Sequence, residues 1–436
     1  MFQRLLRSWE TVHPYNAAQI LNLAGEADPR PIQQAWHDTL AALGLGKVRT
    51  HRDGFFYESL NGEAERYPVR RLPTDTSLAD HLTIEMNRPF NDPEEPPFRP
   101  FLIPGHGSFH LGVVYQHWVA DSVAIRMLLR QWCVRIAESS PPPAAPPPVA
   151  QASYWDLYGT HRARLSMDQV ALGLFRSYIR FRTVQKVCMT GVGDYPVRVL
   201  LRELPPGLIE PLRSAAHSLS VTVGDVLLAA LAQCCHRHVP LQRRPSRRDI
   251  AIGNIIDLRP HAGRDLSGTF GLYLGFSHVV CRREDFGDFA KLLRSVNLQN
   301  QVRRRDGIAQ ASLAWMVAAL IAQRFSKPEK IYRFYRKEIP LAAGLSNVNL
   351  AGTWAEALHP AMVLDYIRVS PTGPMAPLVL STTTLGSRMS LALTYRPTLL
   401  DESAAGELVE SIIHLLAAFT ETLAADKFAR NYPMPH

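Results

Sequence analysis

Residues 110–122 read His-Leu-Gly-Val-Val-Tyr-Gln-His-Trp-Val-Ala-Asp-Ser, and this stretch decides how the rest of the chain is interpreted. Its apolar first half is typical of a buried strand, and its polar end leads into a pattern that predicts an amphipathic helix over 123–136. His117 therefore follows a strand, and Asp121 precedes a helix. A histidine fixed at the end of a buried strand is suited to act as a general base, while the aspartate is suited to hold the turn.

The spacing His-x-x-x-Asp is a weak signal by itself, because the chain has sixteen histidines and repeats the spacing at His261 and Asp265. That second copy lies in a polar, turn-rich segment with no strand immediately before it. Context therefore favours the first copy. Purely structural roles remain open at this point: His117 as a half-buried core residue, and Asp121 as a helix N-cap.

The composition indicates a globular chain of two or three domains, with 436 residues of which 46% are hydrophobic. The five cysteines show no Cys-x-x-Cys spacing, which favours reduced thiols over a disulfide framework or a metal knuckle. The N-terminus lacks the pattern of a signal peptide. The longest apolar run, near 313–322, is too short to cross a bilayer. We therefore expect a cytoplasmic protein, and we expect it to be a monomer.

The net charge of +9 comes mostly from arginine, concentrated in segments 242–248 and 301–305. Such clusters suit a phosphate-bearing molecule, an acidic partner protein or an anionic membrane surface, and they equally suit solvated faces. No aromatic-interleaved RNA motif or zinc-finger spacing accompanies them, so we do not expect a nucleic-acid partner. His236 and His238 would diverge on a helix, so no metal site is expected.

A proline-rich segment at 139–152 is incompatible with a helix or a central strand and predicts a linker. It divides the chain into halves at 1–138 and 153–436. Thr222 and Asp225 have capping-box spacing before a long apolar helix. The other predicted helices lie at 31–43, 78–86, 155–165, 170–182, 207–218, 286–302, 313–325 and 403–423. The predicted strands lie at 15–25, 47–51, 54–60, 101–103, 109–115, 197–203, 249–256, 273–280, 343–347, 366–369, 378–385 and 389–395. Strands mixed with helices in both halves predict α/β layering.

The segment 116–122, Gln-His-Trp-Val-Ala-Asp-Ser, resembles the His-His-x-x-x-Asp-Gly motif of the condensation-domain and chloramphenicol-acetyltransferase-like acyltransferases. The resemblance covers nearly all of the chain and is closest to the polyketide-associated acyltransferases and wax ester synthases. Five further segments resemble family segments in order and spacing: 16–25, 221–231, 254–260, 345–352 and 391–401. The motif departs from the family at both ends, with Gln116 for the first histidine and Ser122 for the final glycine. A glutamine amide can also donate and accept hydrogen bonds, and the second histidine is intact.

The resemblance implies two chloramphenicol-acetyltransferase-like lobes with an active-site tunnel between them. It makes His117 the catalytic base and Gln116 a structural hydrogen-bonding residue. Asp121 would pair with Arg259, which fixes geometry without relaying a proton. Ser346 and Asn347 become candidates for stabilising the oxyanion or positioning the substrate, although a turn role for Asn347 is an equal alternative.

The function implied is transfer of an acyl group from a thioester to the hydroxyl or amine of a small-molecule nucleophile. The product would be an ester or amide of lipid or secondary metabolism. The donor would be a carrier-protein phosphopantetheine or coenzyme A, and no cofactor would stay bound. Four basic residues are candidates for donor binding: Arg243, Arg244, Arg303 and Arg304. The changes at Gln116 and Ser122 keep an alternative open, a noncatalytic relative that binds a carrier protein or partner enzyme. Peripheral membrane contact is a third, weaker interpretation.

Overall fold

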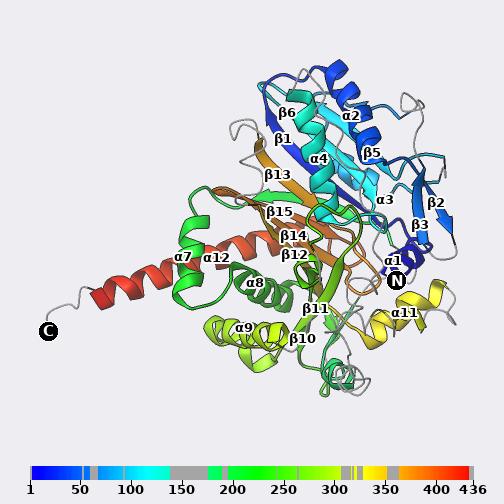
Figure 1. The fold of residues 1–436 in the computed structure, drawn as a ribbon. Coiled ribbons are helices and arrows are strands. Elements are labelled where there is room, and N and C mark those ends of the chain that lie inside the picture. Colours follow the sequence, from blue (N-terminus) through cyan, green and yellow to red (C-terminus); the bar gives the residue numbers. More distant parts are fainter. Residues whose placement is uncertain are drawn as a thin grey trace.

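A computed structural model describes the fold (Figure 1). It covers residues 2–51, 54–58, 67–91, 94–137, 175–188, 195–242, 244–262, 265–305, 316, 319–321, 328–350 and 363–431. Two lobes, each a sheet with packed helices, confirm the predicted α/β class. The predicted linker at 139–152 and the helix at 155–165 lie outside the described residues, as does most of the helix at 313–325.

The sheet of the first lobe has the strand order β13-β1-β6-β5-β4. The strands are β1 (Asn16–Ala24), β4 (Arg70–Arg71), β5 (Phe98–Pro104), β6 (Ser108–Gln116) and β13 (Val363–Val369). Helices α2 (Pro29–Leu43) and α4 (Ser122–Ala137) pack together on one face, where the rings of Trp36 and Trp132 lie 4.7 Å apart and fully buried. Helix α3 (Leu78–Asn87) packs against β1. The core of this lobe therefore fixes the end of β6 that precedes His117.

Strand β13 corrects the predicted division of the chain, because it comes from the second half and pairs antiparallel with β1 of the first. The assignment of all of 153–436 to a second lobe does not describe this strand. The physical reason for this pairing is that β1 would otherwise be the edge strand of its sheet. Without β13, the fully buried residues of β1 would present an unpaired ladder of backbone groups.

The second sheet has the order β11-β10-β12-β14-β15-β8, with β12 parallel to β10 and β14 and the other neighbours antiparallel. The strands are β8 (Arg198–Glu203), β10 (Ile250–Asp257), β11 (Leu274–Cys281), β12 (Ala343–Asn349), β14 (Leu378–Leu385) and β15 (Arg388–Tyr395). The helices gathered on one side of this sheet are α7 (Ile209–Ser218), α8 (Val223–His238), α9 (Phe289–Arg305) and α12 (Glu402–Asn431) (Figure 1). Helix α8 begins at the predicted capping box of Thr222 and Asp225, which is confirmed.

The segment Glu402–Thr422 of α12 is long and apolar enough to cross a membrane by length and composition. Four of its apolar side chains, Leu408, Val409, Ile412 and Leu416, are instead at most 1% exposed in the core of the second lobe. Burial against the protein accounts for its hydropathy.

Two helices were not predicted from the sequence, α1 (Phe2–Glu10) and α11 (Pro328–Glu338). They lie far apart in the chain but pack together, with the rings of Trp9 and Tyr335 edge to face at 5.6 Å. The remaining strands form two small pairs, β2 (Lys47–His51) with β3 (Gly54–Glu58), and β7 (Lys186–Val187) with β9 (Leu241–Gln242). The α1–α11 pair matters because Trp9 reaches the space between the lobes.

Candidate active site

His117 lies directly after β6, with its ring held from two sides. Its Nδ1 is 3.0 Å from the backbone oxygen of Ala120, and its ring stacks on Tyr15 with centroids 5.7 Å apart. A carbonyl oxygen can only accept a hydrogen bond, so the neutral ring carries its proton on Nδ1 and leaves the Nε2 lone pair available. Burial lowers the pKa of His117, opposed by the Ala120 carbonyl and the Asp121 charge. The imidazole is therefore the neutral, basic form near pH 7.

Asp121 directs both carboxylate oxygens into the protein scaffold. Oδ1 accepts from the backbone N–H groups of Val123 and Ala124, each at 3.0 Å, which caps α4. Oδ2 accepts from the backbone N–H of Tyr273 at 2.7 Å and from Nη1 of Arg259 at 2.6 Å. The side chain is completely buried. Both predicted roles, the N-cap and the pairing with Arg259, are therefore present.

Arg259 begins the 3-10 helix η2 (Arg259–His261) and ties the two lobes together through Asp121. Its Nη2 donates to the backbone oxygens of Thr269 at 3.2 Å and Gly271 at 3.4 Å. The guanidinium also lies over the ring of Tyr273, 4.7 Å from its centroid. The buried charge is thus paired with a carboxylate, while Nε is buried without a partner among the described residues. The second His-x-x-x-Asp copy differs, since His261 is exposed and Asp265 accepts from the nearby backbone N–H of Ser267.

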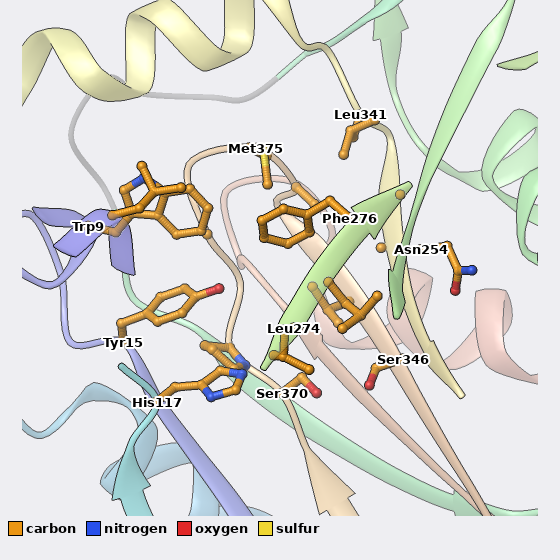
Figure 2. Close-up of a pocket in the computed structure, with 18 of the residues that line it drawn as sticks. Trp9, Tyr15, His117, Asn254, Leu274, Phe276, Leu341, Ser346, Ser370 and Met375 are labelled. Atoms are coloured by element: carbon orange, nitrogen blue, oxygen red, sulfur yellow. The ribbon is translucent and has the colours of Figure 1, made fainter. Parts of the chain in front are cut away.

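A cavity of about 140 Å³ lies between the lobes and reaches His117. Figure 2 shows His117, Tyr15 and Trp9 on one side of it and Leu274, Phe276 and Ser346 on the other. Most of the lining is apolar, with further contributions from both halves by Gln19, Tyr115, Ser122, Ser277, Leu341, Arg368, Ser370 and Met375. This volume is similar to that of engineered apolar cavities that hold benzene. The histidine is therefore accessible to a reactant between the lobes.

The two oxyanion candidates point to opposite sides of β12. Ser346 lines the cavity. The side chain of Asn347 accepts a hydrogen bond from the hydroxyl of Thr382 at 2.8 Å, and its amide nitrogen lies beside Gly224 of α8. Adjacent residues of a strand point to opposite faces, which makes a cavity role for Asn347 incorrect. This alternation was readable from the sequence once 343–347 was taken as a strand.

The two departures from the motif have different surroundings. The Gln116 amide donates to the carboxylate of Glu10 at 3.1 Å and so attaches α1 to the end of β6. Burial raises the pKa of Glu10, and the Gln116 hydrogen bond opposes that rise. Ser122, by contrast, lines the cavity, and its buried hydroxyl has no hydrogen-bond partner among the described residues. The serine thus places a polar group beside the reactive histidine.

The four donor-binding candidates are not brought together. Arg243 lies outside the described residues. Arg244 is exposed on a basic groove beside Arg247 and Arg248, whereas Arg304 is exposed on α9. Burial, together with the charge of Arg180, lowers the pKa of Arg303 to about 10. None of the three described candidates lines the cavity with His117.

Arg368 is the cavity residue that the sequence analysis missed. It lies on β13, is 3% exposed, and donates through Nη2 to the hydroxyl and the backbone oxygen of Ser346. Its Nη1 is buried without a partner among the described residues. Burial, together with the charge of Arg126, lowers its pKa to about 10. A lone arginine in the apolar strand 363–369 was a signal, because arginine is rarely buried without a reason.

No group of three or more His, Cys, Asp or Glu side chains among the described residues is arranged to hold a metal ion. The polar side chains that line the cavity include His117, His278, several hydroxyls and Arg368.

Comparison with known proteins gives no matching family model and no matching curated protein. Solved structures do match, over nearly the whole chain. The trichothecene 15-O-acetyltransferase from Fusarium sporotrichioides has a TM-score of 0.71 at 12% identity, covering 96% of this chain and 94% of that one. Polyketide synthase associated protein 5 from Mycobacterium tuberculosis has a TM-score of 0.64 at 14% identity, covering 96% of both chains. The condensation domain of the monacolin K polyketide synthase MokA has a TM-score of 0.64 at 11% identity, also covering 96% of both. The chain therefore shares the two-lobed fold of these acetyltransferase and condensation-domain structures, which is the fold that the sequence predicted.

Proposed function

We propose that this protein is an acyltransferase that moves an acyl group from a thioester to a hydroxyl or amine, with His117 as the general base. One observation carries the proposal. The imidazole of His117, held through Nδ1 by the backbone oxygen of Ala120, lines a cavity between two lobes, an arrangement that leaves Nε2 as the basic nitrogen of the neutral ring. The structural neighbours that include an acetyltransferase and a condensation domain support the same class of reaction.

In the proposed reaction, Nε2 of His117 removes the proton from the attacking hydroxyl or amine as the new bond to the thioester carbonyl forms. The tetrahedral intermediate then collapses, the carbon–sulfur bond breaks, and the imidazolium returns the proton to the leaving thiolate. No covalent enzyme intermediate is needed, and the five cysteines are free thiols of which four are buried. The hydroxyls of Ser346 and Ser122 line the same cavity and are the candidates for donating to the oxyanion.

Asp121 supports this chemistry without taking part in proton transfer. Its two oxygens accept hydrogen bonds from four donors. Asp121 therefore affects the reaction by holding the turn that carries His117. Its charge also opposes the effect of burial on the pKa of His117. Asp121 is therefore a positioning residue.

The test measures loss of the acyl group from a panel of thioesters, which is monitored by mass spectrometry of the intact thioester molecules. The panel contains short- and long-chain coenzyme A thioesters and the same acyl groups on a phosphopantetheinylated carrier protein, each with and without alcohol and amine acceptors. We expect wild type to release thiol and His117→Ala to do so about 10²–10⁴ times more slowly. His261→Ala is the matched control, because it removes the histidine of the second copy of the motif, and it should keep the wild-type rate. Equal rates for wild type and His117→Ala would contradict the proposal. Carrier binding without thiol release would favour the noncatalytic alternative.

A further inference from the structure

The guanidinium of Arg368 is a buried cation to which the described protein offers no carboxylate. The titratable groups that act on it are Arg126, Tyr115 and Tyr366. The first of these repels it, and the other two are phenols. The nearest acidic residue in sequence, Asp365, accepts from Ser390 at 2.6 Å and lies on the opposite face of the same strand.

Asp121 does not supply the missing charge either. Its oxygens are taken by Arg259, Tyr273 and the first turn of α4. Arg126 on α4 is close enough to repel Arg368, so the neighbouring helix adds a like charge and not a counterion. An uncompensated buried charge is costly to a fold, so a counterion from outside would be bound strongly here.

The sheet register directs Arg368 towards the reaction site. Arg368 pairs with Gln19 on β1, and both residues line the cavity with Tyr115 and His117. Gln19 is held there by its own bonds, donating to the Ser122 backbone oxygen at 3.2 Å and the Tyr115 hydroxyl at 3.4 Å. The unpartnered Nη1 of Arg368 and the unpartnered hydroxyl of Ser122 are two buried donors that belong to residues lining the same cavity.

We propose that Arg368, with the hydroxyls of Ser122 and Ser346, binds the carboxylate of a reactant. A planar guanidinium matches the two oxygens of a carboxylate, and the apolar walls around Trp9 and Phe276 fit an organic acid with an apolar body. This inference rests on the proposed function and deepens it, because it states that one of the two reactants carries a carboxylate that stays unreacted.

A carboxylate fits better than a phosphate at this position. One guanidinium deep in a mostly apolar cavity matches a single negative charge, whereas a phosphate group brings up to two charges and is strongly hydrated. In a pantetheine thioester, the phosphate is also separated from the reacting carbonyl by the whole pantetheine arm. Arg368 instead shares the cavity with His117, where its charge lowers the pKa of that histidine.

The experiment is isothermal titration of the full chain with benzoate, its neutral isostere benzamide, and inorganic phosphate. We expect wild type to bind benzoate about 10–100 times more tightly than benzamide, as for hydrogen bonds to a charged group, and phosphate more weakly than benzoate. Arg368→Met should reduce benzoate binding to the level of benzamide, and Arg368→Lys should give an intermediate value. Arg135→Met is the matched control, because Arg135 is also buried but is bonded to Gln131 and does not line the cavity.

Two readouts keep this inference separate from the proposed function. His117→Ala should still bind benzoate, although it should not catalyse acyl transfer. Benzoate should also raise the pKa of His117 in an NMR titration of the wild type, a measurement that needs no variant to fold. Equal affinity for benzoate and benzamide, tighter binding of phosphate, or unchanged benzoate binding by a folded Arg368→Met variant would overturn the inference. None of those results would bear on thiol release by wild type.

Discussion

Two arginines buried between the lobes, Arg259 and Arg368, have nearly the same exposure, 6% and 3%, and opposite surroundings. Arg259 has a carboxylate at 2.6 Å, two backbone oxygens and an aromatic ring. Arg368 has one serine and no carboxylate among the described residues, although each guanidinium has one buried nitrogen without a described partner. The difference separates two regions of the molecule. The Asp121 side is a closed network that holds the lobes in place, and the cavity side keeps polar atoms available for a reactant.

The largest loss of stability should come from breaking the hydrogen-bond network between Asp121 and Arg259. Replacing Asp121→Ala leaves Arg259 as a buried, uncompensated charge and removes the cap of α4. We expect the free energy of unfolding to fall by about 3–5 kcal/mol, measured by urea denaturation. His117→Ala removes no such partner and should stay within about 1 kcal/mol of wild type. If the two variants were equally destabilised, the distinction between network and cavity would be wrong.

A substitution on the cavity side should change the free energy of unfolding in the opposite direction. Arg368→Met removes a buried charge that lacks a counterion and keeps most of the side-chain volume. The variant should therefore be as stable as wild type or more stable, by about 1–2 kcal/mol. Thermal and urea unfolding of this variant beside Arg259→Met gives a direct comparison, since Arg259→Met strands Asp121 and should be destabilised. A clear loss of stability in Arg368→Met would show that Arg368 is structural.

The capping box of α8, which involves neither arginine, provides a reference for these changes in the free energy of unfolding. Thr222 and Asp225 form a capping box at the start of α8, with the threonine hydroxyl accepting from the Asp225 N–H at 3.0 Å. Thr222→Ala should cost about 1 kcal/mol in urea denaturation, as for other N-caps, with no change in activity. A loss as large as that of Asp121→Ala would mean that capping alone explains the Asp121 effect.

The smallest expected effect is on the titration of His117, which receives opposite influences from the two regions. Burial lowers the pKa of His117 below its ordinary value of 6.5, the Asp121 charge raises it, and the Arg368 charge lowers it. Catalysis needs the neutral ring, so activity should be retained at pH 7 and lost as pH falls through a midpoint below 6.5. In Arg368→Met the ring should titrate at higher pH, as followed by NMR. A shift to lower pH would contradict the placement of these charges.

The sequence predicted the local elements well where the periodicity was strong, as in β1, β6, α8 and the C-terminal strands. It also predicted the Asp121–Arg259 pair, through the resemblance. It could not predict what depends on long-range pairing. The placement of Arg368 in the cavity requires β13 to lie beside β1, and no local pattern specifies that partner. Helix α1 was missed because it spans only nine residues, although Leu5, Leu6 and Trp9 have the spacing of one helix face.

The strand exchange between the halves has a mechanical consequence. Strand β13 is hydrogen-bonded along β1 of the first sheet, and the chain then continues into β14 of the second sheet. The polypeptide therefore connects the two lobes covalently and through this strand pairing. Swinging the lobes apart as free bodies would require that ladder to break. The cavity that reaches His117 should therefore keep a nearly fixed shape. Separate expression of the fragment 1–138 should yield an aggregating product, because it would expose the bare flank of β1.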